Sequence, residues 1–179
     1  MSDTDRQEIL RVLEEGADAL AEALKDMDEA GAGTRPRPES WSALECVEHL
    51  ALTETALLQR LKDARPSGSS HEDRAREAKF KDLAMNRSRR IEAPEPVVPK
   101  GRAKDIAEAL KEFNATRTQT VRFVEEFPGD LRWWLTTHPL ITRPVNCYEM
   151  LLLIAMHPRR HARQIEEARE AARRETDPK

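Results

Sequence analysis

The 179-residue sequence is poor in cysteine, glycine and long apolar runs, and each shortage excludes a class of protein. Its two cysteines, Cys46 and Cys147, cannot build a disulfide scaffold and are typical of a reducing compartment. Its six glycines never form a Gly-rich phosphate-binding motif, so a dinucleotide or P-loop site has no support. No apolar run approaches the roughly 20 residues that cross a bilayer, and the acidic N-terminus lacks the layout of a signal peptide. We therefore expect a soluble cytoplasmic protein with no membrane partner.

An excess of charge of one sign is also lacking. The 30 basic and 33 acidic residues are interspersed and give a net charge of −3. This balance provides no general attraction to nucleic acid, so we expect no nucleic-acid partner. Short runs of like charge, such as Arg87, Arg89 and Arg90, are predicted to be solvated surface.

Leucine, alanine, glutamate and arginine are abundant, and this composition favours helix, while no segment alternates convincingly at period two. Apolar residues recur at intervals of three and four in four segments, which predicts four long helices. Counting their caps, we expect them over residues 3–28, 42–63, 103–127 and 146–173. Capping boxes are predicted at Ser42 with Glu45 and at Asn146 with Glu149, and Thr4 has the same spacing to Gln7.

Residues 64–102 are polar and rich in proline, with room for one short helix over residues 75–90. Neither side of this stretch has enough amphipathic helix to close a core alone, so it is predicted to be a long connection inside a single domain of residues 1–179. An irregular stretch with Trp133, Trp134 and the pair His138-Pro139 is expected before the last helix. The predicted fold is all-α, a four-helix bundle with a long connection between the second and third helices.

Three of the five histidines fall on predicted inner faces. His157 and His161 are four residues apart in a stripe of core residues, about 40° apart around the helix axis, so both rings can reach one ion. His49, in the middle of the second helix, can supply a third imidazole. Three neutral imidazoles suit a divalent metal such as zinc, nickel, iron or copper and leave positions for water or substrate. His71 and His138 lie in polar connections, where surface or structural roles are expected.

The alternative is a purely structural helical dimerisation protein with hydrogen-bonded histidines in its core. Other residues have two interpretations as well. Arg117 interrupts the apolar stripe of the third helix, so it either pairs with a carboxylate such as Glu54 or clamps an anionic substrate. Cys46 either approaches the metal or is a small buried residue. Pro158 removes an amide hydrogen bond inside the last helix, which predicts a kink.

Taken in order, these motifs resemble the DinB-like superfamily over residues 41–168. The motifs are Trp41-Ser42-x-x-Glu45-x-x-x-His49-Leu50, a proline-rich stretch, His138-Pro139 and His157-x-x-Arg160-His161-x-x-Gln164-Ile165. Many relatives continue the His-Pro element with a glycine-containing turn, whereas this chain reads Leu140-Ile141-Thr142-Arg143-Pro144. The co-substrate is therefore not carried over from the family.

The resemblance implies an up-down-down-up four-helix bundle, often a homodimer, with one divalent metal held by His49, His157 and His161. Relatives with an activity resemble bacillithiol- or mycothiol-dependent enzymes, S-transferases and a maleylpyruvate isomerase, in which the metal activates a low-molecular-weight thiol. A thiol-dependent S-transferase acting on an electrophilic small molecule is therefore expected. The alternatives are a metal-dependent hydrolase and a non-catalytic metal-binding stress-response or binding module.

Ligand histidines usually donate their second N–H to a carboxylate or carbonyl group. Glu45, Glu54 and Glu149 are the carboxylates predicted to take this role. No catalytic residue beyond the metal ligands is assigned from the sequence.

Overall fold

The computed structural model describes residues 3–88 and 91–176, with side chains described as far as residue 170. Four long helices dominate it: α1 (Asp3–Leu24), α3 (Ala43–Lys62), α5 (Ile106–Glu126) and α6 (Cys147–Thr176). The shorter elements are α2 (Glu29–Gly33), α4 (Arg74–Met85), the 3-10 turns η1 (Glu95–Val97) and η2 (Leu131–Trp133), and the strands β1 (Arg65–Pro66), β2 (Trp134–His138) and β3 (Ile141–Asn146). No helix in the described part of the chain is long and apolar enough to cross a membrane.

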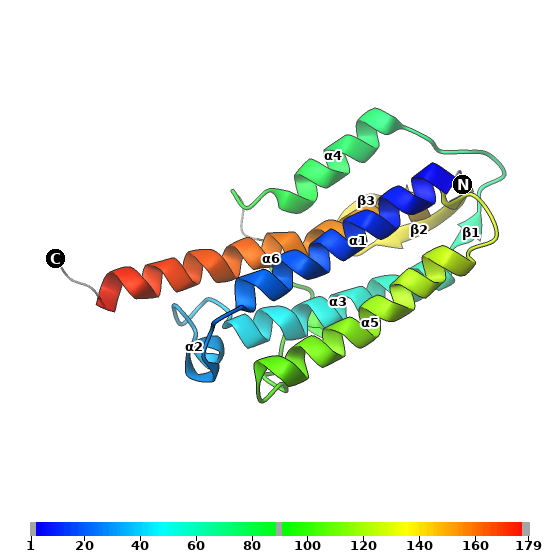
Figure 1. Ribbon diagram of the computed structural model, residues 1–179. Coiled ribbons are helices and arrows are strands. Elements are labelled where there is room, and N and C mark those ends of the chain that lie inside the picture. The colour runs from blue at the N-terminus through cyan, green and yellow to red at the C-terminus, as the bar shows by residue number, and fades with distance from the viewer. Residues whose placement is uncertain (1–2, 89–90, 177–179) are drawn as a thin grey trace.

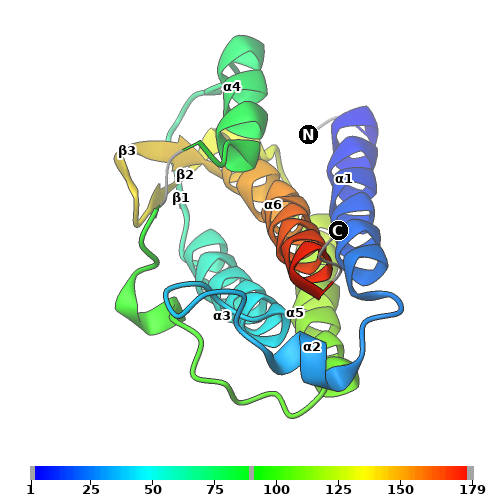
Figure 2. The same cartoon turned by 90° about the vertical axis from the view of Figure 1, so that its left-hand side faces the viewer.

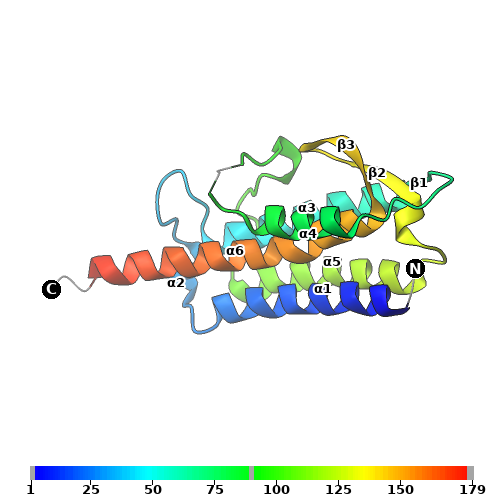
Figure 3. The same ribbon diagram turned by 90° about the horizontal axis from the view of Figure 1, so that it is seen from above.

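The four long helices pack as a bundle. Helix α1 lies beside α6 and α5, and α3 lies beside α5 and α6, so that each long helix has two neighbours (Figures 1 and 2). The colours in Figure 1 show that α1 and α6 run in one direction and α3 and α5 in the other. Because the neighbours α3 and α5 are parallel, the chain has to return along the bundle between them, and the long connection does this. Helix α4 belongs to that connection and packs on α6, as Figure 3 shows from above.

The buried apolar side chains form two groups along the bundle. The first group includes the buried apolar residues of α6 up to Met156, and the second includes those from Ala162 onward. His157 and His161 lie between these two stretches, so the candidate ligands occupy the junction of the two halves of the core.

Both predicted capping boxes of the long helices are confirmed. The Glu45 N–H donates to Ser42 Oγ (3.2 Å) and the Ser42 N–H to Glu45 Oε2 (2.9 Å). The corresponding distances for Asn146 and Glu149 are 2.8 and 3.0 Å. The caps therefore fix where the two ligand-bearing helices begin.

The first helix begins at Asp3 as predicted, but it was predicted too long, and its capping residue was misassigned. It already includes Asp3, so Thr4 lies inside α1 and is not its N-cap. It ends at Leu24 and not at residue 28, because the backbone turns at Asp26 (φ 57°) and Asp28 caps the separate helix α2. The short helix expected over residues 75–90 ends at Met85, and Arg89 and Arg90 lie outside the described residues.

The all-α prediction is wrong in one respect. The stretch before the last helix is a β-hairpin, and β1 joins it to make an antiparallel sheet in the order β1-β2-β3. Trp134 and His138, expected in irregular chain, are the first and last residues of β2. The hairpin is short and mostly half-exposed, with an irregular register between Thr136 and His138, so it leaves no clear period-two pattern.

Helix α1 lies very close to α6 at Gly16. A Cβ atom at this position would lie 2.5 Å from the Ala155 carbonyl oxygen and 3.7 Å from Pro158 Cγ. Pro158 does not end helix α6, which continues beyond it to Thr176. The missing side chain of Gly16 thus lets α1 pack against the turn of α6 that carries His157.

We predict that Gly16→Ala destabilises the protein, because a backbone oxygen cannot move aside as a flexible side chain can. The expected loss is about 1–3 kcal/mol in the free energy of unfolding, the usual cost of overpacking. Chemical denaturation measures it. Gly33→Ala is the matched control, since no atom lies within 4 Å of a Cβ built there. Equal stability of the two variants would contradict the close approach.

Candidate metal centre

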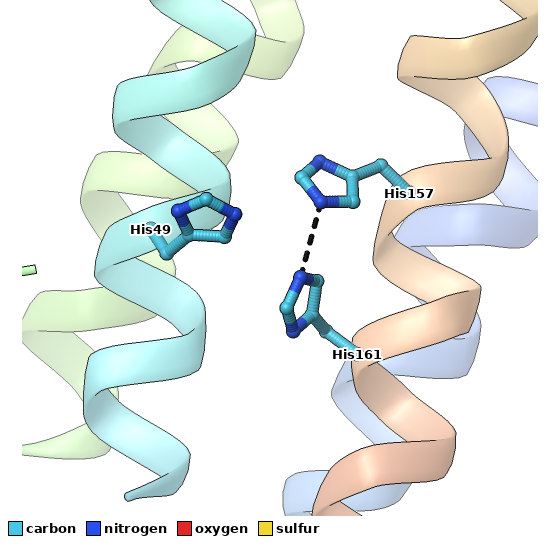
Figure 4. A group of neighbouring side chains, drawn as sticks. All are labelled: His49, His157 and His161. Atoms are coloured by element: carbon cyan, nitrogen blue, oxygen red, sulfur yellow. Dashed lines mark hydrogen bonds between the residues drawn. The ribbon is translucent and has the colours of Figure 1, made fainter. Parts of the chain in front are cut away.

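Three histidines from two helices converge in the interior of the bundle. His49 extends from α3 toward His157 and His161 on α6 (Figure 4). Their candidate ligand atoms all lie within 4.8 Å of one another, and the Nε2 atoms of His157 and His161 are 3.0 Å apart. The ring centroids of His49 lie 5.1 Å from those of both α6 histidines. The i, i+4 spacing and the facing helix thus bring the three rings together as predicted.

A backbone carbonyl group orients the His49 ring. His49 Nδ1 lies 2.7 Å from the Val97 carbonyl oxygen in η1. A carbonyl oxygen only accepts hydrogen bonds, so Nδ1 carries the proton of the neutral ring. The lone pair of Nε2 is then free for a ligand, and Val97 takes the role in which a carboxylate was expected.

Glu48, the neighbour of His49 in sequence, holds the chain that follows Val97. Its buried carboxylate accepts hydrogen bonds from the backbone N–H groups of Lys100 and Arg102, each at 3.0 Å. Glu48 therefore anchors this loop on α3, and the loop presents the carbonyl group that orients His49.

Trp41 forms an aromatic wall beside the histidines. Its ring centroid lies 4.6 Å from that of His49 and 6.3 Å from that of His161, nearly parallel to the latter. It also packs against the core group that contains Cys46. Trp41 thus shields one side of the centre from water.

The three imidazoles are neutral near pH 7. Burial lowers the pKa of all three, and His157 and His161 fall well below the ordinary value because neighbouring histidines and arginines add to the effect. The Val97 hydrogen bond only partly opposes this for His49. The neutral form is the one that binds a metal.

These residues fit a divalent metal ion. Two nitrogens that both ligate one zinc ion at about 2.0–2.1 Å lie no more than about 4 Å apart, and the His157–His161 pair meets this limit. His161 Nδ1 is buried without a hydrogen-bond partner among the described residues, whereas its Nε2 lies 3.0 Å from His157 Nε2. A set of three imidazoles accepts zinc, nickel or iron, which are not distinguished by these ligands.

The carboxylates predicted to support the ligands have other partners. Glu45 binds Arg35 and the Ser42 backbone; burial raises its pKa, but these hydrogen bonds outweigh burial and lower it. Glu149 caps α6 and pairs with Arg76 at 2.7 Å. Both serve the ends of helices, so neither orients a ligand ring.

Arg117 and Glu54 pair with each other inside the bundle. Arg117 Nη2 donates to Glu54 Oε2 at 2.8 Å, and Arg117 Nη1 donates to the Leu13 carbonyl oxygen of α1 at 2.8 Å. Both side chains are buried, and burial raises the pKa of Glu54 and lowers that of Arg117. The structure thus gives Arg117 the structural pairing and leaves Glu54 away from the ligand nitrogens.

The remaining histidines and Cys46 do not belong to the cluster of three imidazoles, although the charge of His138 contributes to the lowered pKa of His157. The backbone of His71 pairs with Arg132 and Asn146 beside the sheet. His138 accepts the N–H of Leu140 in the hairpin turn, and burial together with Arg60 lowers its pKa to about 4. Burial raises the pKa of Cys46 to about 12, which makes it an inert thiol at neutral pH.

Sequence reasoning missed several neighbours of the centre. Val97 contributes only a carbonyl oxygen, which leaves no signal in a side-chain pattern. Glu48 had a detectable signal, an acidic residue beside His49 on a helix whose other faces are largely apolar. Arg87 was predicted to be solvated surface, but its side chain is three-quarters buried and binds Gln164 and Glu167 on α6.

Fold and site together define a helical bundle with a three-histidine centre. The sequence profile of the DinB superfamily matches residues 12–165, and the chain therefore belongs to this superfamily. Among curated protein sequences, no significant match was found.

Two solved structures share the fold. YfiT from Bacillus subtilis, described as a probable metal-dependent hydrolase with an unusual four-helix bundle topology, is 17% identical. It aligns over 99% of this chain and 91% of its own with a TM-score of 0.59. A conserved protein from Enterococcus faecalis is 16% identical over 96% of this chain and 97% of its own, with a TM-score of 0.62. At these identities the similarity establishes the fold alone.

We predict that the stability of the metal-free protein falls between pH 7.5 and pH 5.5, in part because of His161. Its pKa is lowered in the folded state, so the unfolded chain, with a histidine pKa of about 6.5, binds more protons in this range. Stability is complete above pH 6.5 and is lost as the pH falls toward the folded-state pKa. His161 accounts for about 1 kcal/mol of the loss.

Denaturant unfolding of EDTA-treated protein at both pH values measures this difference. The drop in unfolding free energy should be smaller in His161→Gln, since glutamine binds no proton. An identical drop in variant and wild type would show that His161 titrates normally.

Proposed function

We propose that the protein binds one divalent metal ion through His49, His157 and His161 and uses it to activate a nucleophile against a small-molecule substrate. The convergence of three neutral imidazoles, with no carboxylate among the ligands, carries this proposal. A bound divalent cation supplies Lewis-acid chemistry: it lowers the pKa of a thiol or water molecule so that the deprotonated nucleophile is available near neutral pH. Three protein ligands are typical of catalytic centres, which keep a position open.

The nucleophile we propose is a low-molecular-weight thiol taken from solution, and the reaction is its transfer to an electrophilic small molecule. Neither cysteine of the chain can serve, because burial raises the pKa of both Cys46 and Cys147 to about 12. The thiol proton leaves to solvent, the sulfur forms the new bond to the electrophile, and the leaving group departs with its electron pair. Membership in the superfamily supports this choice.

Metal-dependent hydrolysis is the second candidate, and the similarity to YfiT supports it. Water would then be the nucleophile at the same centre. Both candidates need the same three ligands and the same orientation of His49 by Val97. They differ in the co-substrate, which a direct comparison of nucleophiles distinguishes.

The up-down-down-up order of the long helices belongs to the same proposal and is supported by the chain directions in Figure 1. We also propose that the protein is a homodimer, on the basis of its family membership. A cytoplasmic location is proposed because both cysteines are free. The oligomeric state is measured by light scattering on the purified protein.

We predict that the purified protein holds about one divalent metal ion per chain and that each ligand is needed for it. His49→Ala, His157→Ala and His161→Ala should each lower the occupancy measured by elemental analysis, because two imidazoles bind far more weakly than three. His71→Ala is the matched control, since His71 lies in the connection before α4. Unchanged occupancy in the three ligand variants would contradict the proposed centre.

We predict that metal-loaded protein accelerates the reaction of low-molecular-weight thiols with a bromobimane-type electrophile. Turnover should disappear on chelation and in His157→Ala, which retains both cysteines. Hydrolysis of activated esters is assayed in parallel without thiol. Ester hydrolysis with no thiol transfer would select the hydrolase, and neither activity would select a metal-binding module without catalysis.

A further inference from the structure

Arg160 is a half-buried cation at the metal centre. It lies three residues after His157 and directly before His161 on α6. Among the described residues its one hydrogen-bond partner is the uncharged carbonyl oxygen of Asn86, and no described carboxylate forms an ion pair with it. A guanidinium group has five N–H donors, so most of its donors remain available.

A second guanidinium lies close by. Arg87 follows Asn86 at the end of α4, donates to Gln164 Oε1 at 3.3 Å and pairs with Glu167 at 2.6 Å. Its Nε atom is buried without a hydrogen-bond partner among the described residues. Burial and the positive charge of Arg87 lower the pKa of Arg160, and both arginines contribute to the lowered pKa of His161. Among the described residues Glu167 pairs with Arg87, and no carboxylate pairs with Arg160.

The proximity of two guanidinium groups raises the electrostatic free energy of the site unless an anion binds there. Two like charges in a partly desolvated place repel each other, and a divalent cation at the three histidines would add to the repulsion. The histidines carry no negative charge to offset it. The α4–α6 contact explains where Arg87 lies, but it leaves the charge of Arg160 uncompensated.

We propose that Arg160, assisted by Arg87, forms an oxyanion subsite beside the three histidines and selects substrates or co-substrates that carry a carboxylate or phosphate group. The planar guanidinium of Arg160 matches either group with two parallel hydrogen bonds. Such a molecule places its anionic group on Arg160 while its reacting atom reaches the metal centre. This inference rests on the proposed function for the role of the subsite, but not for anion binding itself.

The first test uses metal-free protein titrated with succinate and, separately, with inorganic phosphate, followed by calorimetry or NMR. Arg160→Gln should weaken binding at least fivefold. Arg163→Gln, the same charge change at an exposed position of the same helix, should alter it less than twofold. Arg160→Lys, which keeps the charge but loses the fork, should retain part of the affinity and serves as a second variant should Arg160→Gln fail to fold. The two probes show which oxyanion the subsite prefers.

The second test uses cobalt(II)-loaded protein and compares 3-mercaptopropionate with its uncharged analogue 3-mercaptopropanamide by the thiolate-to-cobalt absorption band. Wild type should prefer the carboxylate at least fivefold, and Arg160→Gln should lose this preference. Equal effects of Arg160→Gln and Arg163→Gln on anion binding, or no saturable binding of either anion, would overturn the subsite. If the wild type does not take up cobalt, the proposed metal centre is contradicted. The titration of metal-free protein with anions still tests the subsite in that case.

Discussion

The guanidinium group of Arg132 holds together the end of the bundle from which the hairpin emerges. It is almost fully buried, binds Glu77 of α4 at 2.6 Å and Asp5 of α1 at 3.1 Å, and lies 3.7 Å above the ring of Tyr148 on α6. Burial alone would lower the pKa of Arg132, but its two carboxylate partners raise it. Only the loss of both carboxylates would leave this buried charge uncompensated, since either one alone still pairs with it. This one side chain therefore fixes α1, α4 and α6 relative to one another.

The position of α4 in turn determines what surrounds the histidines. Its end brings Asn86 and Arg87 onto α6 beside Arg160. Further along the same connection, the Val97 carbonyl group reaches His49 on α3. One connection thus contacts both helices that carry the three histidines, and the Arg132 network at one end of the bundle supports the geometry of the centre.

The sequence predicted the parts of the site that follow from helix periodicity. Capping boxes located the starts of α3 and α6, and the i, i+4 spacing of His157 and His161 placed both rings on one face. The sequence did not predict the features that depend on contacts between distant parts of the chain. The β-hairpin has an irregular register and is completed to a sheet by residues 65–66, far away in sequence. The partner of His49 is a backbone oxygen that no side-chain pattern encodes. Glu45 was predicted to face the interior and support a ligand histidine, but its carboxylate binds Arg35, which lies ten residues earlier in a loop.

The charge of the centre bears on the choice of nucleophile. Three neutral imidazoles leave the full charge of a divalent cation in place, whereas a carboxylate ligand would reduce it. Arg160 and Arg87 add two more positive charges nearby, and among the described residues a carboxylate, that of Glu167, pairs with Arg87 but none with Arg160. An anionic thiolate that carries a carboxylate gains from both the cation and the arginines, while a small hydroxide gains from the cation alone. The electrostatics around His157 and His161 therefore suit a co-substrate that carries an anionic group in addition to its nucleophilic atom.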